Sequence, residues 1–269
     1  MMQAISFRPT GTSLCASIFS LLVLAAIPPT ASGQAERIPV DSHNHSTPAT
    51  PASAASPFIV VGFVGGFIRH DDPVHAEVQL AARLRKAYPT GVDVETFESY
   101  HGENARAKIL SLLDTNHDKN LTSSEKQNAR IILYGHSWGA SEAIAVAREL
   151  EKDGIPVLLT IQVDSISKIG HNDTVIPGNV AEAANFYQTN GFVRGQPVIR
   201  AADPKRTKII GNFRFDYKTS PYTCNEYPWY DRIFVKAHTQ IECDPNVWKQ
   251  TEDLIRAELP PPTSSDSKP

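Results

Sequence analysis

Apolar residues fall along this chain in short continuous runs that alternate with longer segments of helical spacing. Runs rich in β-branched and aromatic residues predict strands at residues 57–67, 92–97, 129–135 and 155–164. Between and after them the apolar positions recur with the period of a helix, which predicts helices over 74–88, 104–114 and 140–154. Because strand and helix alternate, the pattern predicts an α/β fold with a mostly parallel sheet and helices on both faces.

The last third of the chain has a less regular pattern. We expect a helix over 179–188, an extended segment over 207–217 and a closing helix over 246–259. The chain shows no internal repeat, and residues 58–259 have the length of one ordinary domain.

Both ends of the chain differ in composition from this domain. Residues 1–33 hold a weakly basic start, a short apolar run and small residues before Gln34, which predicts a signal peptide and a secreted or periplasmic protein. A membrane anchor is the alternative, but it needs about 20 apolar residues. Residues 34–57 are rich in Pro, Ala, Ser and Thr and predict a disordered linker, and residues 260–269 predict a disordered tail.

The charge of the chain limits the kinds of partner that the sequence indicates. The chain has 26 basic and 29 acidic residues, a formal net charge of −3 without a run of like charge, so neither nucleic acid nor an anionic membrane is indicated.

Once the leader is removed, Cys224 and Cys243 are the cysteines that remain. In an oxidising compartment we expect them to form a disulfide, which would stabilise the fold by about 3 kcal/mol. Two buried free thiols are the alternative.

The segment ARIILYGHSWGASEA, residues 129–143, places a serine between two glycines where a predicted strand meets a predicted helix. A serine on such a sharp turn takes a strained backbone conformation that directs its hydroxyl out of the sheet. The positions two before and two after lie too close to other backbone for a side chain, which accounts for Gly135 and Gly139. The pattern resembles the nucleophile elbow of the α/β-hydrolase superfamily, among them lipase- and esterase-like serine hydrolases. This resemblance implies that Ser137 is a catalytic nucleophile, against the alternative of a plain turn that carries a serine.

A nucleophilic serine needs a histidine base and an acid that orients the base. In the fold that the chain resembles, the order is serine, acid, histidine. His238 is expected in a loop before the last helix, within KAHTQIECDPNVW, which resembles the histidine region of secreted lipases, and we choose it over His171. Asp164 ends a predicted parallel strand, where such sites are built, and is our choice of acid. Its alternative role is a capping or turn aspartate, and the other candidates for the acid are Asp173, Asp203 and Asp216.

The oxyanion of a tetrahedral intermediate needs two backbone N–H donors. The resemblance implies Trp138 as one donor and, from the GFVGGF segment after the first strand, Phe67 or Gly66 as the other. A glycine-rich packing turn explains the same segment. His136 is expected in the wall of the site, because its backbone position directs it away from the serine hydroxyl.

Residues 114–125 carry a second pattern, made of oxygen-bearing side chains. Their spacing resembles the calcium loop of an EF-hand, with ligand positions at Asp114, Asn116, Asp118, Asn120 and Glu125. Lys119 stands where that loop has glycine, which costs about 1 kcal/mol and places a positive charge beside the ion. The pattern predicts a structural Ca²⁺ site. The alternative, which is compatible with it, is a polar loop in which Thr122 and Glu125 cap a short helix.

Two weaker groups are noted beside these. His70, Asp71, Asp72 and His75 follow the first strand and could bind a metal or line the mouth of the site, although a loop that caps the next helix explains them as well. The aromatic run YPWY, residues 227–230, could line a substrate pocket or pack in the core.

Together these features predict an exported serine hydrolase that cleaves a small-molecule or lipid carboxylic ester through Ser137, His238 and Asp164 and an acyl-enzyme. The chemistry requires no cofactor, Ca²⁺ is expected to be structural, and no stable membrane span is expected. The alternative is a non-catalytic, calcium-dependent binding or structural protein on a hydrolase scaffold.

Overall fold

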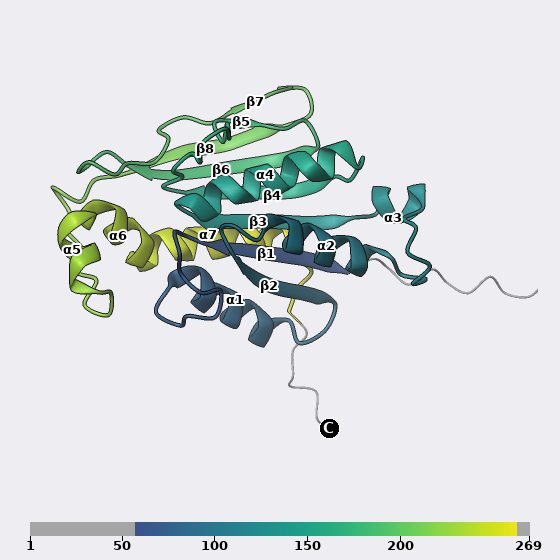
Figure 1. Cartoon of the computed structure of the whole chain (residues 1–269), viewed down its shortest axis with the longest axis horizontal. Helices are drawn as coiled ribbons and strands as arrows, with labels where there is room; N and C mark the ends of the chain where they lie inside the picture. The colour runs from purple at the N-terminus through teal and green to yellow at the C-terminus, as the bar shows by residue number, and fades with distance from the viewer. Residues whose placement is uncertain (1–56, 263–269) are drawn as a thin grey trace, which may run out of the picture. The chain divides into compact units, whose positions relative to one another are not determined.

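The computed structural model describes residues 57–262, which contain a six-stranded sheet (Figure 1). Its strands lie in the order β2-β1-β3-β4-β6-β8, and every neighbouring pair is parallel. The strands are β1 (Phe58–Val64), β2 (Val92–Glu98), β3 (Arg130–His136), β4 (Val157–Val163), β6 (Val180–Gln188) and β8 (Lys208–Phe215). A separate two-residue pairing joins β5 (Val175–Ile176) to β7 (Arg200–Ala201).

Helices cover both faces of this sheet, as the sequence predicts. The longer helices are α1 (Ala76–Ala87), α2 (Gly102–Leu113), α4 (Trp138–Lys152) and α7 (Pro245–Glu258), and the short ones are α3 (Ser123–Gln127), α5 (Trp229–Phe234) and α6 (Lys236–Cys243). In Figure 1, α2 and α4 cross in front of the sheet and α7 runs behind it.

The alternation of side chains along each strand divides the core into two layers. In β1, Val60 packs in the layer that holds α1 and α7, whereas Ile59 and Val61 pack in the layer that holds α2 and α4. Because both faces are covered, the central strands are apolar at nearly every position, and this is the signal that the sequence shows.

Residues 179–188 do not form the predicted helix, because Val180–Gln188 are the strand β6. The segment NVAEAANFYQ contains alanine and glutamate, which favour helices, and its apolar positions fit either period. The segment instead pairs with β4 on one side and β8 on the other, and Ala183, Ala184 and Phe186 are buried there. Tertiary pairing outweighs local propensity at this position.

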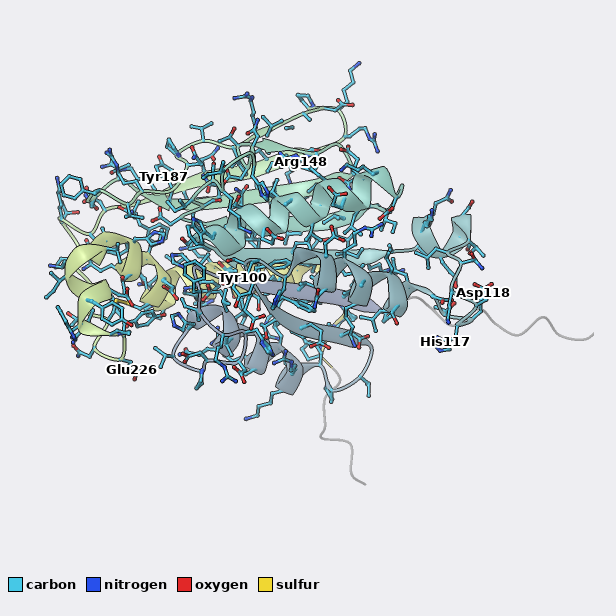
Figure 2. The ribbon with its side chains drawn as sticks, in the orientation of Figure 1. Tyr100, His117, Asp118, Arg148, Tyr187 and Glu226 are labelled. Atoms are coloured by element: carbon cyan, nitrogen blue, oxygen red, sulfur yellow. A yellow bond between two sulfur atoms is a disulfide. The ribbon has the colours of Figure 1, made fainter. Side chains whose placement is uncertain are left out.

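The parallel arrangement separates the two predicted sites. All six carboxyl ends lie at one edge of the sheet, and the turns after β3 and β4 place Ser137 and Asp164 there. The loop of residues 114–125 precedes β3 and lies at the opposite edge. Seven residues of β3 at about 3.3 Å each put roughly 20 Å between the edges. In Figure 2, His117 and Asp118 lie on one side of the domain, and Glu226, near α5, lies on the opposite side.

Among residues 57–262, none of the helices combines the length and the apolar character that crossing a membrane requires. The predicted signal peptide, nearly all of the predicted linker and residues 263–269 of the predicted tail lie outside the described residues.

Candidate active site

Ser137 occupies the sharp turn between β3 and α4 with a backbone conformation that few residues adopt. Its φ is 55° and its ψ is −125°, which is a strained combination for a residue with a side chain. The backbone N–H of Ser137 donates to the carbonyl of Val163 at 3.0 Å, so β4 holds the turn in place. The serine therefore has the strained backbone that the glycine pattern predicts, and Asp164 also has a positive φ, of 43°.

The two flanking glycines are required by contact with backbone. A β-carbon on Gly135 would lie 2.5 Å from the carbonyl carbon of Gly139, and one on Gly139 would lie 2.2 Å from the carbonyl oxygen of Phe63. Rigid backbone atoms cannot yield to such contacts, so α4 can approach the sheet only if both positions are glycine.

The structure brings Ser137, His238 and Asp164 together, although they lie on three different elements. His238 Nε2 is 2.9 Å from Ser137 Oγ, and His238 Nδ1 is 2.7 Å from Asp164 Oδ2. Asp164 is fully buried, and the other two are about nine-tenths buried. An acid that accepts from Nδ1 holds the Nε2 lone pair toward the serine hydroxyl.

His238 lies in the first turn of α6, and not in a loop as the sequence pattern suggests. Residues 237–242 are buried, and Asp244 then caps α7 by accepting from the Asn246 N–H, with Pro245 at the first position of that helix. The segment predicted as a loop before the last helix is thus α6, which the single capping residue Asp244 separates from α7.

The other predicted candidates lie outside this group. His171 is exposed, Asp203 caps a turn at Lys205, and Asp216 caps a turn at Lys218. Asp173 is buried but accepts from the hydroxyls of Ser165 and Ser167.

Asp164 is fixed by partners that the sequence analysis missed. Besides His238, its carboxylate accepts from the Gln188 N–H at 3.2 Å, the Gln188 side-chain amide at 2.8 Å and the Gly195 N–H at 2.8 Å. A β-carbon on Gly195 would lie 2.4 Å from Asp164 Oδ1, so this close approach needs glycine. The one sequence signal for these contacts is Gln188 at the end of an apolar run, and that run favours the predicted helix over 179–188.

The predicted oxyanion loop lies beside the nucleophile. A β-carbon on Gly65 would lie 3.1 Å from Ser137 Cβ, and Gly66 has a positive φ of 51°. The ring of Phe67 meets the ring of Trp138 edge-on at 5.5 Å. Trp138 N begins α4, where the helix dipole favours negative charge. The donor roles of Trp138, Gly66 and Phe67 stay predictions.

The ring of His136 packs against that of His238, and His136 makes no hydrogen bond to Ser137. Its ring centre is 4.4 Å from that of His238, and it is 2% exposed. Burial lowers the pKa of His136 to about 4, so the free side chain is neutral at pH 7. This placement agrees with the predicted wall position.

His75, Glu77 and Glu242 form a buried polar group next to His136. His75 Nδ1 is 2.5 Å from Glu242 Oε1. Burial opposes the charge of His75, but the bond to Glu242 outweighs it and raises the pKa of His75 to about 9. Burial, reinforced by the Glu242 carboxylate, raises the pKa of Glu77 to about 8.

The sequence grouped His75 with three neighbours that the structure separates from it. His70 pairs with Glu98 at 2.9 Å, Asp71 pairs with Arg69, and Asp72 accepts from the Val74 N–H ahead of α1. Only His75 enters the buried group.

The loop at residues 114–125 adopts several features of the predicted calcium loop. Asp114 accepts from the Lys119 N–H at 2.8 Å, and Lys119 has the positive φ of 67° that a glycine would favour. Both oxygens of Glu125 are engaged, one with Thr115 and one with Thr122, in a complete capping box for α3. These bonds lower the pKa of Glu125 to about 2. Each oxygen of Glu125 accepts two hydrogen bonds, so a Ca²⁺ ion would have to replace bonds from Thr115 and Thr122, and calcium binding stays a prediction.

Calorimetric titration tests this loop. We expect Ca²⁺ to bind the full chain and to bind Lys119→Gly about five-fold more tightly, because the substitution removes both the backbone strain and a nearby positive charge. Glu125→Gln should bind more weakly than the wild type. Equal heats for the wild type and Glu125→Gln would contradict an EF-hand role.

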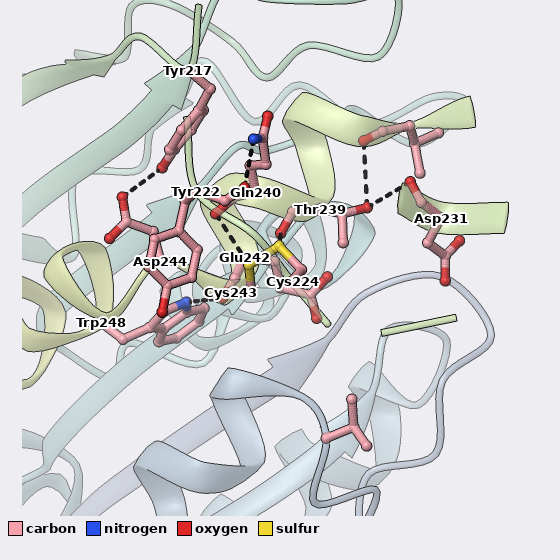
Figure 3. The surroundings of a disulfide bond; sticks show 12 residues. Tyr217, Tyr222, Cys224, Asp231, Thr239, Gln240, Glu242, Cys243, Asp244 and Trp248 are labelled. Carbon is pink, nitrogen blue, oxygen red and sulfur yellow. Dashed lines mark hydrogen bonds between the residues drawn. A yellow bond between two sulfur atoms is a disulfide. The ribbon is translucent and has the colours of Figure 1, made fainter. Parts of the chain in front are cut away.

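Cys224 and Cys243 form the predicted disulfide, with 5.9 Å between their Cα atoms (Figure 3). Cys243 is the last residue of α6, one turn beyond His238, and Glu242 lies directly beside it. The bridge therefore ties the helix that carries the histidine to the segment before α5.

A parallel sheet with helices on both faces, a serine elbow after a central strand, and the order Ser137, Asp164, His238 define the α/β-hydrolase fold. No family model matches the sequence, and the search of curated proteins found no match.

Solved structures similar to this chain include a cutinase-like protein, an esterase and a thioesterase. A cutinase-like protein from Cryptococcus sp. is 11% identical, with a TM-score of 0.39 and coverage of 78% of this chain and 98% of that chain. A thermostable esterase from Pseudomonas putida is 12% identical, with a TM-score of 0.39 and coverage of 78% and 77%. A thioesterase from the prodiginine pathway of Streptomyces coelicolor is 12% identical, with a TM-score of 0.35 and coverage of 73% and 98%. At these identities and TM-scores, the similar structures do not indicate the activity of this chain, which depends on its own side chains.

Proposed function

We propose that this protein is a serine hydrolase that cleaves carboxylic esters through an acyl-enzyme. The observation that carries the proposal is the continuous hydrogen-bonded chain from Asp164 through His238 to Ser137 Oγ. A structural polar network has no need of a strained serine at its end, whereas a nucleophile does.

The steps follow from the geometry. His238 Nε2 takes the proton of Ser137 Oγ as the oxygen attacks the ester carbonyl, and Asp164 stabilises the imidazolium that results. The oxyanion is placed toward the N–H of Trp138 and that of Phe67 or Gly66. His238 then gives its proton to the leaving alcohol, and a water molecule, activated by the same nitrogen, releases the acid. These steps use no cofactor.

Exposed apolar side chains near the carboxyl ends of the strands favour a substrate with an apolar group. Exposed residues follow four of the parallel strands there, namely Phe67 after β1, Tyr100 after β2, Ile169 after β4 and Phe192 after β6. Gathered apolar exposure of this kind marks a contact surface. We propose a small-molecule or lipid ester with an apolar portion as the substrate.

We also propose that the protein acts outside the cytoplasm, secreted or periplasmic. The disulfide between Cys224 and Cys243 supports this location, because such bonds persist in oxidising compartments. The apolar leader of residues 1–33 is the second reason.

A fluorophosphonate probe tests the nucleophile. We expect the wild type to be labelled and Ser137→Ala to remain unlabelled, because the probe requires an activated serine oxygen. Ser141→Ala is the matched control, since Ser141 is a fully buried serine in the same helix and should not affect labelling. Folded wild-type protein that takes no label would contradict the proposal and favour a non-catalytic binding or structural role. A panel of p-nitrophenyl esters of increasing chain length would then give the acyl preference.

A further inference from the structure

The buried polar group behind the active site draws on three separate elements. His75 and Glu77 lie at the start of α1, Glu242 lies near the end of α6, and His136 ends β3. All four residues are less than one-tenth exposed. One ligand atom from each of His75, Glu77 and Glu242 falls within 4.8 Å of the others.

Several of these atoms have no hydrogen-bond partner. Both carboxylate oxygens of Glu77 and both ring nitrogens of His136 are buried without a hydrogen bond of normal geometry. Buried polar atoms of a folded protein are nearly always satisfied, and leaving one unpaired is costly. Glu77 and His136 thus leave several buried lone pairs without a partner in the described part of the chain, and a cation that accepts several lone pairs at once would satisfy them.

The spacing of the atoms suits a small tetrahedral cation. Bonds of about 2.0–2.2 Å to nitrogen and oxygen place the ligands of a tetrahedral zinc ion about 3.3–3.5 Å apart. His136 Nδ1 is 3.4 Å from Glu242 Oε2 and 3.8 Å from Glu77 Oε1. The His75–Glu242 contact is shorter, at 2.5 Å. A metal ion bound by both atoms would take the place of this hydrogen bond and separate them.

We propose that His75, Glu77 and Glu242, together with His136, bind one Zn²⁺ ion behind the active site. The donor set of imidazole and carboxylate without thiolate matches zinc. Tyr227 lies beside the group, since its ring lies 5.2 Å from that of His75, and its buried hydroxyl has no hydrogen-bond partner among the described residues.

The ion would connect the parts that position the catalytic histidine. Glu242 lies four residues after His238, on the same side of α6, and His136 directly precedes Ser137. Zinc would therefore fix α6 against the end of β3 and the start of α1. Its role is structural support of the site, outside the reaction itself.

A surface pocket lies next to the proposed site. A pocket of about 500 Å³ is lined by Val74 and Ala76, the neighbours of His75, by Cys243, the neighbour of Glu242, and by Tyr227. A hydrated ion that enters this pocket would meet the group after a movement of the Tyr227 ring.

The zinc content of the protein tests the proposal independently of any hydrolase activity. We would strip the full chain with a chelator, dialyse it against Zn²⁺ with excess Ca²⁺ present to occupy the 114–125 loop, and determine bound zinc by atomic emission. We expect one zinc per chain and a rise of about 5–10 °C in Tm at saturating zinc. Replacement by Co²⁺ should give the visible absorption of a tetrahedral site.

Single substitutions show which side chains bind the zinc ion. Glu77→Gln keeps size and removes a ligand, so zinc affinity should fall by more than the roughly 10–100-fold that changes in outer partners cause. The matched control is Glu98→Gln, because Glu98 joins His70 and His101 in a histidine–glutamate group at the surface, and this variant should bind zinc as the wild type does. Ser137→Ala should also bind zinc normally, which separates this proposal from the proposed function.

Three results would overturn the proposal. The first is wild-type protein that retains no zinc after dialysis. The second is loss of binding in Glu98→Gln with binding preserved in Glu77→Gln, which would place the ion at the surface. The third is a Co²⁺ spectrum typical of octahedral coordination. The first and third results use the wild type, so they stand even if Glu77→Gln fails to fold.

Discussion

Asp164→Asn should lower kcat by about 10⁴-fold while KM changes little. The side chain of Asp164 contacts no substrate, so binding is spared. An asparagine would keep the shape but lose the negative charge that stabilises the His238 imidazolium. Its amide group would also face donors on every side, because the carboxylate now accepts from Gln188, Gly195 and His238. An imidazole held in the wrong tautomer cannot take the proton of Ser137.

The measurement is steady-state hydrolysis of the best p-nitrophenyl ester, with a thermal melt to show that each variant is folded. Asp173→Asn is the matched control, since Asp173 is equally buried, was a candidate acid and bonds only outside the triad. We expect it to retain kcat within about ten-fold while it loses stability, because the amide nitrogen of asparagine replaces the acceptor of one of the two serine hydroxyls. If Asp173→Asn were the inactive variant and Asp164→Asn the active one, the assignment of the acid would be wrong.

The sequence predicted the parts of the site that depend on local pattern. Ser137 is marked by two glycines that steric contact requires, and Asp164 by its position at the end of a buried strand. His238 is marked by the segment KAHTQIECDPNVW before the last helix, although this segment forms α6 and not the predicted loop. Each of these signals lies within a few residues of the side chain that it identifies.

The support around the triad depends on contacts between residues far apart in sequence. Gln188 and Gly195 reach Asp164 only because residues 179–188 pair as a strand, and strand pairing leaves no mark within the segment itself. Similarly, His75 and Glu242 are separated by 167 positions, so no spacing indicates that they meet. The buried polar group behind the site is visible only in three dimensions.

Gly139→Ala should lower the free energy of unfolding by about 3 kcal/mol and the Tm by about 6–12 °C. The expected sign is opposite to the rule for helices, in which replacing glycine by alanine stabilises by about 1 kcal/mol. Gly139 lies in the first turn of α4, where it meets the end of β1. A β-carbon there would be 2.2 Å from the carbonyl oxygen of Phe63 and 2.7 Å from that of Val64. Relief requires α4 to move away from the sheet.

That movement would also displace Ser137, which precedes α4, so fluorophosphonate labelling should slow together with the loss of stability. Gly178→Ala is the matched control, because its new β-carbon would meet only the flexible ends of Glu151 and Arg206, at 3.3 and 3.7 Å. We expect its stability to stay within about 0.5 kcal/mol of the wild type. Chemical denaturation followed by tryptophan fluorescence gives both values. A Gly139→Ala variant as stable as the wild type would show that α4 can shift without strain, and the steric origin of the glycine pattern would then be wrong.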